Sequence, residues 1–295
     1  MSGRIVITGA GGQLGGCLHS LATAQGRDVV AFTSSEWDVT DPAAADRIIR
    51  RGDVVINCAA YTDVDGAESD EAGAYAVNAA GPEHIARACA RAGAQLIHVS
   101  TDYVFGGDGS TPRPFEPSDQ PAPQGVYAQS KLAGERAVLA ALPDAVIVRT
   151  AWVYTGDTGK DFVAVMRRLA EGDGPVNVVD DQTGSPTYVG DLAAALLQVV
   201  DDRVPGPVLH AANEGVVSRF EQARAVFEEC GADPARVHPV STEQFPRPAP
   251  RPSYTALSGR ESAAAGLTPL RPWRPALVAA LAASGADRPL PSTRD

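Results

Sequence analysis

Five short runs rich in β-branched residues alternate with longer segments of helical length in the first half of this 295-residue chain. Each run is apolar along its whole length, which is typical of strands buried on both faces of a parallel sheet. Strands that alternate with helices predict a doubly wound parallel sheet, the α/β Rossmann arrangement. We expect strands at Ile5–Thr8, Asp28–Phe32, Asp53–Asn57, Gln95–Ser100 and Ala145–Arg149, and helices at Gln13–Gln25, Pro42–Arg50, Glu71–Arg91 and Val126–Leu142.

The second half of the chain is less regular and predicts a smaller mixed α/β substrate-binding lobe. We therefore expect a dinucleotide-binding domain over residues 1–150 and a lobe over residues 151–285, part of which returns to the first domain. Residues 286–295 are polar and contain prolines, so a mobile tail is expected there. Within the lobe we expect a strand near Asn177–Val179 and helices near Phe162–Glu171, Gly190–Val200, Ser218–Cys230 and Pro275–Ala283.

A glycine-rich segment joins the first expected strand to the first expected helix. Its spacing, Gly-x-x-Gly-x-x-Gly, is typical of a dinucleotide-binding loop. Glycine permits a tight turn and a close approach of the backbone to a pyrophosphate, and the helix N-terminus offers free N–H donors. The alternative is a flexible loop without a ligand. The residues expected to contact the cofactor here are Gly9, Gly12, Gln13, Leu14 and Gly15.

The end of the second strand bears on the choice of cofactor, because an acidic residue there binds the ribose 2′-hydroxyl and repels a 2′-phosphate. Residues 32–35 read Phe-Thr-Ser-Ser, and no carboxylate follows until Glu36. We therefore expect NADPH, with Ser34 among its contacts, while NADH stays open because no arginine adjoins these hydroxyls. Asp38 and Val39 are expected to bind and cover the adenine edge; alternatively, Asp38 caps a helix.

Tyr127 and Lys131 lie four positions apart, and Lys131 is one of only two lysines in the chain. Positions i and i+4 share one face of a helix, so the phenol and the ammonium can address the same small volume. The cation is expected to lower the pKa of the tyrosine and so help it to exchange a proton with a carbonyl or alcohol. This pair points to a hydride-transfer site; the alternative is an ordinary surface pair.

Three further segments lie at strand ends, where a doubly wound sheet binds its ligand. They read Ile56-Asn57-Cys58-Ala59-Ala60-Tyr61-Thr62-Asp63-Val64-Asp65, Ala76-Val77-Asn78-Ala79 and Val99-Ser100-Thr101-Asp102-Tyr103-Val104-Phe105. Later segments read Arg149-Thr150-Ala151-Trp152-Val153-Tyr154, Asp181-Gln182-Thr183-Gly184-Ser185-Pro186-Thr187 and Arg251-Pro252-Ser253. With these motifs the chain resembles the extended short-chain dehydrogenase/reductases, and within them the dTDP-4-dehydrorhamnose reductase family, from about Arg4 to Leu281.

The resemblance implies NAD(P)H-dependent reduction of the 4-keto group of a dTDP-linked deoxysugar, with conversion of dTDP-4-dehydrorhamnose to dTDP-L-rhamnose as the leading candidate. It implies that Thr101 steadies the substrate oxygen, Tyr127 donates a proton, and Lys131 holds the nicotinamide ribose. The further cofactor contacts that it implies are Ala59, Ala60, Tyr61, Thr62 and Asn78, together with Tyr127 and Lys131; Asn78 also supports proton relay. The implied substrate contacts are Thr101, Asp102, Tyr127, Trp152, Gln182 and Arg251.

Several alternatives stay open at this point. Thr101 could be an ordinary strand-end hydroxyl, Trp152 could belong to the core, and Arg251 could be a solvated residue of a proline-rich linker. A sibling ketoreductase of another deoxysugar pathway, or a non-catalytic NADP-binding regulatory subunit, would share most of these motifs. Nucleotide-sugar dehydratases place Asp-Glu after the threonine, whereas Tyr103 follows Asp102 here, and the epimerase signature also differs.

The composition of the chain excludes several classes of binding partner. A net charge of −11 argues against an extended nucleic-acid footprint and against binding to anionic membranes. The four cysteines are widely spaced without partnered histidines, so we expect neither disulfides nor zinc, and a cytoplasmic location. Some family members carry a glutamate after the glycine run that contributes to a magnesium-bridged dimer; here Gly16 and Cys17 follow. We therefore expect no metal, and a homodimer stays open.

Overall fold

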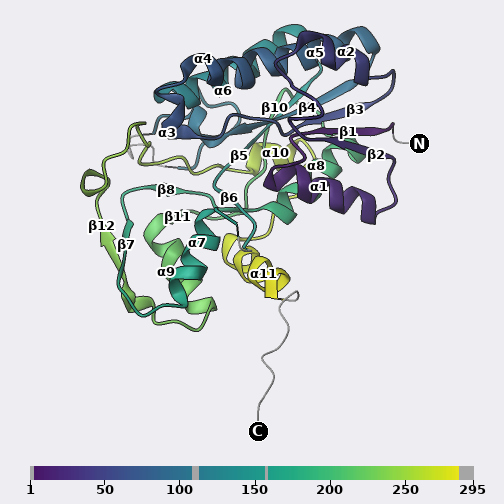
Figure 1. The fold of residues 1–295 in the computed structure, drawn as a ribbon. Helices are drawn as coiled ribbons and strands as arrows, with labels where there is room; N and C mark the ends of the chain where they lie inside the picture. The colour runs from purple at the N-terminus through teal and green to yellow at the C-terminus, as the bar shows by residue number, and fades with distance from the viewer. Residues whose placement is uncertain (1–2, 108–112, 157–158, 286–295) are drawn as a thin grey trace.

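Six parallel strands form one sheet with helices on both faces, as the alternating pattern predicts (Figure 1). The structure is a computed structural model that describes residues 3–107, 113–156 and 159–285. The tail expected at residues 286–295 lies outside the described residues. The doubly wound α/β fold is confirmed. In spatial order the strands are β2 (Val29–Phe32), β1 (Ile5–Thr8), β3 (Val54–Asn57), β4 (Gln95–Thr101), β5 (Val146–Thr150) and β10 (Val208–His210).

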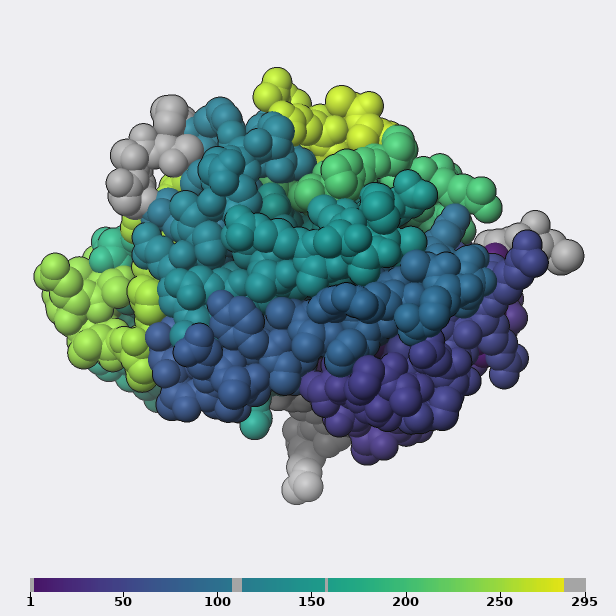
Figure 2. All heavy atoms as spheres, turned by 90° about the horizontal axis from the view of Figure 1, so that it is seen from above, coloured from purple at the N-terminus to yellow at the C-terminus, as the bar shows by residue number. Residues whose placement is uncertain are grey.

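Both faces of the sheet are buried by helices. On one face Ile5 and Ile56 pack against α1 (Gln13–Ala24) and α8 (Val189–Asp202). On the other face lie α2 (Pro42–Ile48), α5 (Gly81–Ala92) and α6 (Gly125–Ala141). Figure 2 views this second face, where the helices lie side by side and hide the sheet. Strands covered on both faces are mainly apolar, which explains the hydrophobic runs in the sequence.

Part of the second half of the chain returns to this sheet. β10 pairs in parallel with β5, so that Leu209 lies opposite Val148. Leu192 and Leu196 of α8 are fully buried in the same core as α1. The carboxyl edge of the sheet therefore carries loops from both halves of the chain, and these loops meet above β1, β3, β4 and β5.

The second lobe has an apolar core of its own, to which Val163, Met166, Val178, Phe227 and Leu277 contribute. It lies below the main sheet in Figure 1. Its helices are α7 (Phe162–Ala170), α9 (Arg219–Glu229) and α11 (Trp273–Gly285), with the short helices η3 (Pro234–Arg236), η4 (Thr242–Gln244) and α10 (Arg260–Ala264) nearby in sequence. Its strands form three pairs: β6 (Val153–Tyr154) with β9 (Thr187–Tyr188), β8 (Thr183–Gly184) with β11 (Val217–Ser218), and β7 (Val176–Val179) with β12 (Val237–Val240).

The helix expected over Glu71–Arg91 is present as one continuous helical run, but it is not α-helical throughout. The structure has α4 (Glu71–Tyr75), then a π-helical segment η1 (Ala76–Ala80), then α5; the short α3 (Val64–Ala67) precedes them. Pro82 has no N–H to donate to the carbonyl of Asn78 four residues earlier, so regular α-helical bonding fails at this point. A side chain at Gly134 of α6 would collide with that carbonyl, so the glycine lets the two helices approach.

Candidate active site

The glycine loop after β1 lies beside the chain that leaves β3. Gly9 has φ +68°, and a Cβ there would lie 2.8 Å from the backbone N of Ala59. A Cβ at Gly15 would collide with the carbonyl oxygen of Gly9. Both positions therefore require glycine, one for its backbone angle and both for close packing. The loop lies between β1 and β3, where successive strands leave β1 on opposite sides, which is the ligand-binding switch point of such sheets.

The N-terminus of α1 is suited to an anion. Gly12 is its N-cap and supplies no side-chain cap, and the first turn contains no acidic residue, so N–H groups stay available for a phosphate. The side chain of Gln13 instead donates to Asp161 Oδ2 at 3.0 Å, across to the second lobe. The side chain of Leu14 packs against the core. Contacts from Gln13 and Leu14 to a cofactor would therefore come from the backbone.

Thr101, Tyr127 and Lys131 come together at the carboxyl end of β4. Thr101 ends that strand, and its hydroxyl acts on the pKa of Tyr127, so it lies close to this residue in the first turn of α6. Lys131 is one turn further on; it is buried, and its Nζ donates to the carbonyl of Val99 at 2.8 Å. The i, i+4 spacing thus does place the phenol and the ammonium on one helix face beside the strand end.

The expected lowering of the tyrosine pKa is not found. Burial raises the pKa of Tyr127, and the nearby hydroxyl of Thr101 opposes this only in part. Burial also lowers the pKa of Lys131 to about 8, although Glu135 and Cys58 act in the opposite direction. Spacing alone placed the ammonium correctly, but desolvation dominates the titration of both buried groups.

Asn78 joins the strand-end loop to the catalytic helix. Its Oδ1 accepts from the backbone N of Tyr61 at 2.9 Å, and its Nδ2 donates to the carbonyl of Tyr61 and to Ser130 Oγ, both at 3.1 Å. Asn78 is fully buried, whereas Thr62 is exposed. This arrangement fixes the backbone that contains Ala59, Ala60, Tyr61 and Thr62 beside α6.

The turn after β2 contains a carboxylate that the sequence argument placed too far away. Glu36 folds back, and its Oε2 accepts from the backbone N of Thr33 at 2.9 Å and from Thr33 Oγ1 at 2.8 Å. These bonds lower the pKa of Glu36. Ser34 is exposed in the same turn. The strand end therefore combines hydroxyls with a negative charge.

Asp38 and Val39 follow this turn. Asp38 Oδ1 accepts from the backbone N and Oγ1 of Thr40, while Asp41 caps α2, so Asp38 is not the helix cap. The side chain of Val39 is buried against Gly81, where a Cβ would lie 2.9 Å from it. A contact between Val39 and an adenine would therefore use its backbone or the remaining exposed edge of its side chain.

Asp102 is buried beside Thr101 in the short helix η2 (Asp102–Val104). Its Oδ1 accepts from Thr101 Oγ1 at 3.0 Å, and its Oδ2 accepts from Thr255 Oγ1 at 2.5 Å. Burial raises the pKa of Asp102 to about 6, although both hydrogen bonds act to lower it. Sequence reasoning missed Thr255, since no motif points to a hydroxyl 153 residues away.

Trp152 lies between β5 and β6, directly before Val153, and has an unusual backbone, with φ 48°. Left-handed backbone is uncommon for a bulky residue and is concentrated at functional sites. The Trp152 ring is only half-buried, and a Cβ at Gly184 would lie 2.6 Å from it. The guanidinium of Arg219 lies 3.5 Å from the centre of the Trp152 ring. Sequence reasoning also missed Arg219, whose only signal was its place directly after the serine that caps α9.

The two remaining expected substrate contacts are anchored within the protein. Gln182 Nε2 donates to Thr242 Oγ1 at 2.9 Å. Arg251 is mostly buried; it pairs with Asp65 Oδ1 at 3.1 Å and donates to the carbonyl of Ala249 at 2.9 Å. Arg251 is therefore not the solvated linker residue that the sequence left open. Figure 1 shows its segment beside α3, which contains Asp65.

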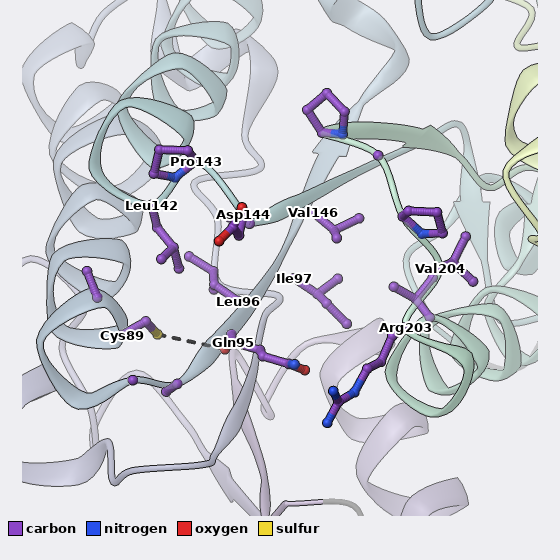
Figure 3. Close-up of a pocket in the computed structure, with 18 residues that line it drawn as sticks. Cys89, Gln95, Leu96, Ile97, Leu142, Pro143, Asp144, Val146, Arg203 and Val204 are labelled. Atoms are coloured by element: carbon purple, nitrogen blue, oxygen red, sulfur yellow. Dashed lines mark hydrogen bonds between the residues drawn. The ribbon is translucent and has the colours of Figure 1, made fainter.

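Another cavity, of about 630 Å³, lies at the opposite edge of the sheet, where β4 and β5 begin (Figure 3). Its lining is mainly apolar side chains and backbone, with Asp144 and Arg203 on either side. The thiol of Cys89 donates to the carbonyl of Gln95 there, and burial raises its pKa to about 12. This cavity lies away from the residues that converge at the carboxyl edge, and it offers no comparable set of reactive groups.

In the part of the chain that the structure describes, no group of three or more histidine, cysteine or acidic side chains is arranged to hold a metal ion. No helix there is both long enough and apolar enough to cross a bilayer.

This chain is similar to known proteins over nearly its whole length. The family model described as the RmlD substrate binding domain matches residues 3–285. A dTDP-4-dehydrorhamnose reductase of Mycobacterium tuberculosis is 75% identical, over 100% of this chain and 99% of its own length. A crystal structure of the Bacillus anthracis dTDP-4-dehydrorhamnose reductase in complex with NADP has a TM-score of 0.87 and 36% identity, covering 94% of this chain and 98% of that one.

A dTDP-4-keto-6-deoxy-D-glucose reductase of Streptomyces niveus is 40% identical, over 97% of this chain and 99% of its own length. Relatives with different keto sugars in their names therefore share this fold over nearly their full length. The family model and the M. tuberculosis relative each span essentially the whole described chain. This chain belongs to the dTDP-4-dehydrorhamnose reductase family.

Proposed function

We propose that this protein reduces the 4-keto group of a dTDP-linked deoxysugar with NADPH, converting dTDP-4-dehydrorhamnose to dTDP-L-rhamnose. The observation that carries this proposal is the convergence of Thr101, Tyr127 and Lys131 at the end of β4, next to a glycine loop built for a dinucleotide. The relative from M. tuberculosis is 75% identical and bears the reductase name, which supports the same reaction.

NADPH would supply the hydride, and the residues present fit it. The uncapped start of α1 would hold the pyrophosphate through backbone N–H groups. Gly9 has no side chain, so the glycine loop can pack closely against the backbone of Ala59. Lys131 would bind the nicotinamide ribose, and Asn78 would hold the neighbouring loop in place. Ser34 and Asp38 would meet the adenosine half.

Tyr127 would donate its proton to the carbonyl oxygen as that oxygen gains negative charge. Burial raises the pKa of Tyr127, so the phenol is protonated at neutral pH and ready to donate. The Thr101 hydroxyl, which donates to Asp102 and lies close to Tyr127, would steady the same oxygen. Asp102, Trp152, Gln182 and Arg251 would then surround the sugar nucleotide.

We also propose that the protein acts in the cytoplasm. All four of its cysteines are free thiols in the structure, from the buried Cys89 to the exposed Cys230, and free thiols persist in a reducing compartment.

The direct test supplies dTDP-4-dehydrorhamnose and NADPH and follows the loss of NADPH absorbance. We expect turnover by the wild type, and a fall of at least about 100-fold in kcat for Tyr127→Phe, because general acid catalysis typically contributes that much. Tyr75→Phe, a tyrosine of α4 outside the site, is the matched control and should keep its activity. NMR of the product separates L-rhamnose from the product of a sibling ketoreductase. No oxidation of NADPH, or full activity in Tyr127→Phe, would overturn the proposal.

A further inference from the structure

Arg219 is a half-buried cation without an ion-pair partner among the residues that the structure describes. Its guanidinium lies 3.5 Å from the centre of the Trp152 ring and 4.9 Å from that of Phe162. Its one side-chain hydrogen bond goes to Gln222 Oε1 and is long, at 3.3 Å. A guanidinium has five donors, so most of its hydrogen-bonding capacity is unused by the protein.

The position of Arg219 follows from three adjacent backbone segments. β11 ends at Ser218, directly before Arg219, and pairs with β8, where Ser218 lies opposite Thr183. The backbone N of Arg219 donates to the carbonyl of Gln182 at 3.1 Å. On the other side, Thr183 bonds through its backbone to residues 253 and 255. Arg219 is therefore held in the same ribbon as the segment that contains Arg251 and Thr255.

The ring of Tyr103 lies between the catalytic Tyr127 and two arginines, Arg219 and Arg251. The ring of Tyr103 packs edge-on against that of Tyr127, with 5.9 Å between their centres. The pKa of Tyr103 responds to the charges of both Arg219 and Arg251, so both arginines lie near this one ring. Burial lowers the pKa of Arg219 to about 10; Tyr103 and Asp102 oppose this effect, and repulsion from Arg251 adds to it. Two guanidinium groups thus lie near the ring of Tyr103.

Three carboxylates lie near this region, and none of them forms an ion pair with Arg219 among the described residues. Asp102, whose charge acts on Arg219, accepts from Thr101 and Thr255. Asp65 already accepts from Arg247, Arg251 and the backbone N of Ala249. Asp161, which lines a cavity of about 300 Å³ together with Arg219 and Trp152, already accepts from Gln13, Thr155 and the backbone N of Ala164. A dianionic group would match the two arginines, and planar guanidinium groups bind phosphate oxygens in pairs.

We propose that Arg219 binds the diphosphate of the sugar nucleotide at its sugar-proximal phosphate, opposite Arg251. The assignment to that phosphate rests on the proposed function, which places the sugar carbonyl at Tyr127 and the nucleotide towards Arg251. Arg219 lies on the sugar side because its charge acts on Asp102, beside Thr101. Arg219 also stacks on Trp152, an expected sugar contact, so the phosphate contact and the sugar contact would lie side by side.

The test compares the binding of dTDP and dTMP by calorimetry, because dTMP lacks the sugar-proximal phosphate. For Arg219→Met we expect the Kd of dTDP to rise about tenfold or more and that of dTMP to change less than about twofold. Arg219→Lys keeps the charge but loses the planar fork, so its Kd for dTDP should lie between those of Arg219→Met and wild type. Arg224→Met removes an exposed arginine of the same helix and should leave both Kd values unchanged.

Two results would overturn the proposed role of Arg219. Equal weakening of dTDP and dTMP in Arg219→Met would show a merely structural role, and unchanged binding of dTDP would show no contact; either result overturns the inference. The Arg219→Lys variant gives the same comparison if Arg219→Met fails to fold. A wild type that binds dTDP tightly but does not reduce the keto sugar would defeat the proposed function while leaving the role of Arg219 intact.

Discussion

Replacement of Asp102 with asparagine should change how stability depends on pH. Burial raises the pKa of Asp102 to about 6, above its ordinary value of 3.8. Because the folded pKa lies above the unfolded one, the carboxyl contributes stability below about pH 4 and loses that contribution as the pH rises through about 6. One unit of pKa corresponds to about 1.4 kcal/mol, so the difference of about 2 costs about 3 kcal/mol at high pH.

The assay is urea unfolding of the wild type and Asp102→Asn between about pH 5 and pH 8. Other groups titrate in both proteins, so the difference between the two free energies of unfolding isolates Asp102. Relative to the variant, the wild type should lose about 1.4 kcal/mol over that range, because part of the total loss falls below pH 5. Thr255→Val removes a hydroxyl that lowers the pKa of Asp102, so it should move the midpoint to higher pH.

A difference that stays constant from pH 5 to pH 8 would refute this reasoning. It would mean that Asp102 has the same pKa in the folded and unfolded chain, despite its burial between Thr101 and Thr255. A difference that changes in the opposite direction would mean that the hydrogen bonds outweigh desolvation.

Two further predictions concern other carboxylates. Glu135→Gln should lower the free energy of unfolding by about 3–5 kcal/mol in denaturant titrations, because it removes the negative charge 2.7 Å from the buried guanidinium of Arg149. Glu83→Gln, in an exposed pair, should cost less than about 1 kcal/mol. Glu36→Gln removes the negative charge at the end of β2. In steady-state kinetics, kcat/KM for NADPH should then rise relative to kcat/KM for NADH by roughly threefold. An unchanged ratio would exclude a role of Glu36 in the choice between the two cofactors.

Local patterns predicted the parts of the site that depend on neighbours in sequence. The apolar runs placed β1, β3 and β4 almost residue by residue, because burial on both faces leaves no other composition for such strands. The spacing of Tyr127 and Lys131 predicted a shared helix face, and α6 provides it. Chain order at strand ends likewise placed Thr101 beside them.

Long-range contacts could not be predicted in this way. Thr255 reaches Asp102 across 153 residues, and Arg247 reaches Asp65 across 182. Neither contact leaves a periodicity in the sequence, because it depends on how the second lobe folds back over the first. The position of Glu36 was missed for a related reason: its separation of three residues from Thr33 gives no indication that the side chain folds back onto the strand end.

The titration of Tyr127 shows why the environment matters as much as the spacing. A lysine four residues away predicts an easier phenolate, yet burial raises the pKa of Tyr127, and the Nζ of Lys131 is bonded to the carbonyl of Val99. For a reductase this direction is useful, since the phenol must carry its proton until the substrate oxygen becomes negative. The oxidation of an alcohol would instead need the phenolate. The buried Tyr127 is therefore in the protonated state from which ketone reduction starts at neutral pH.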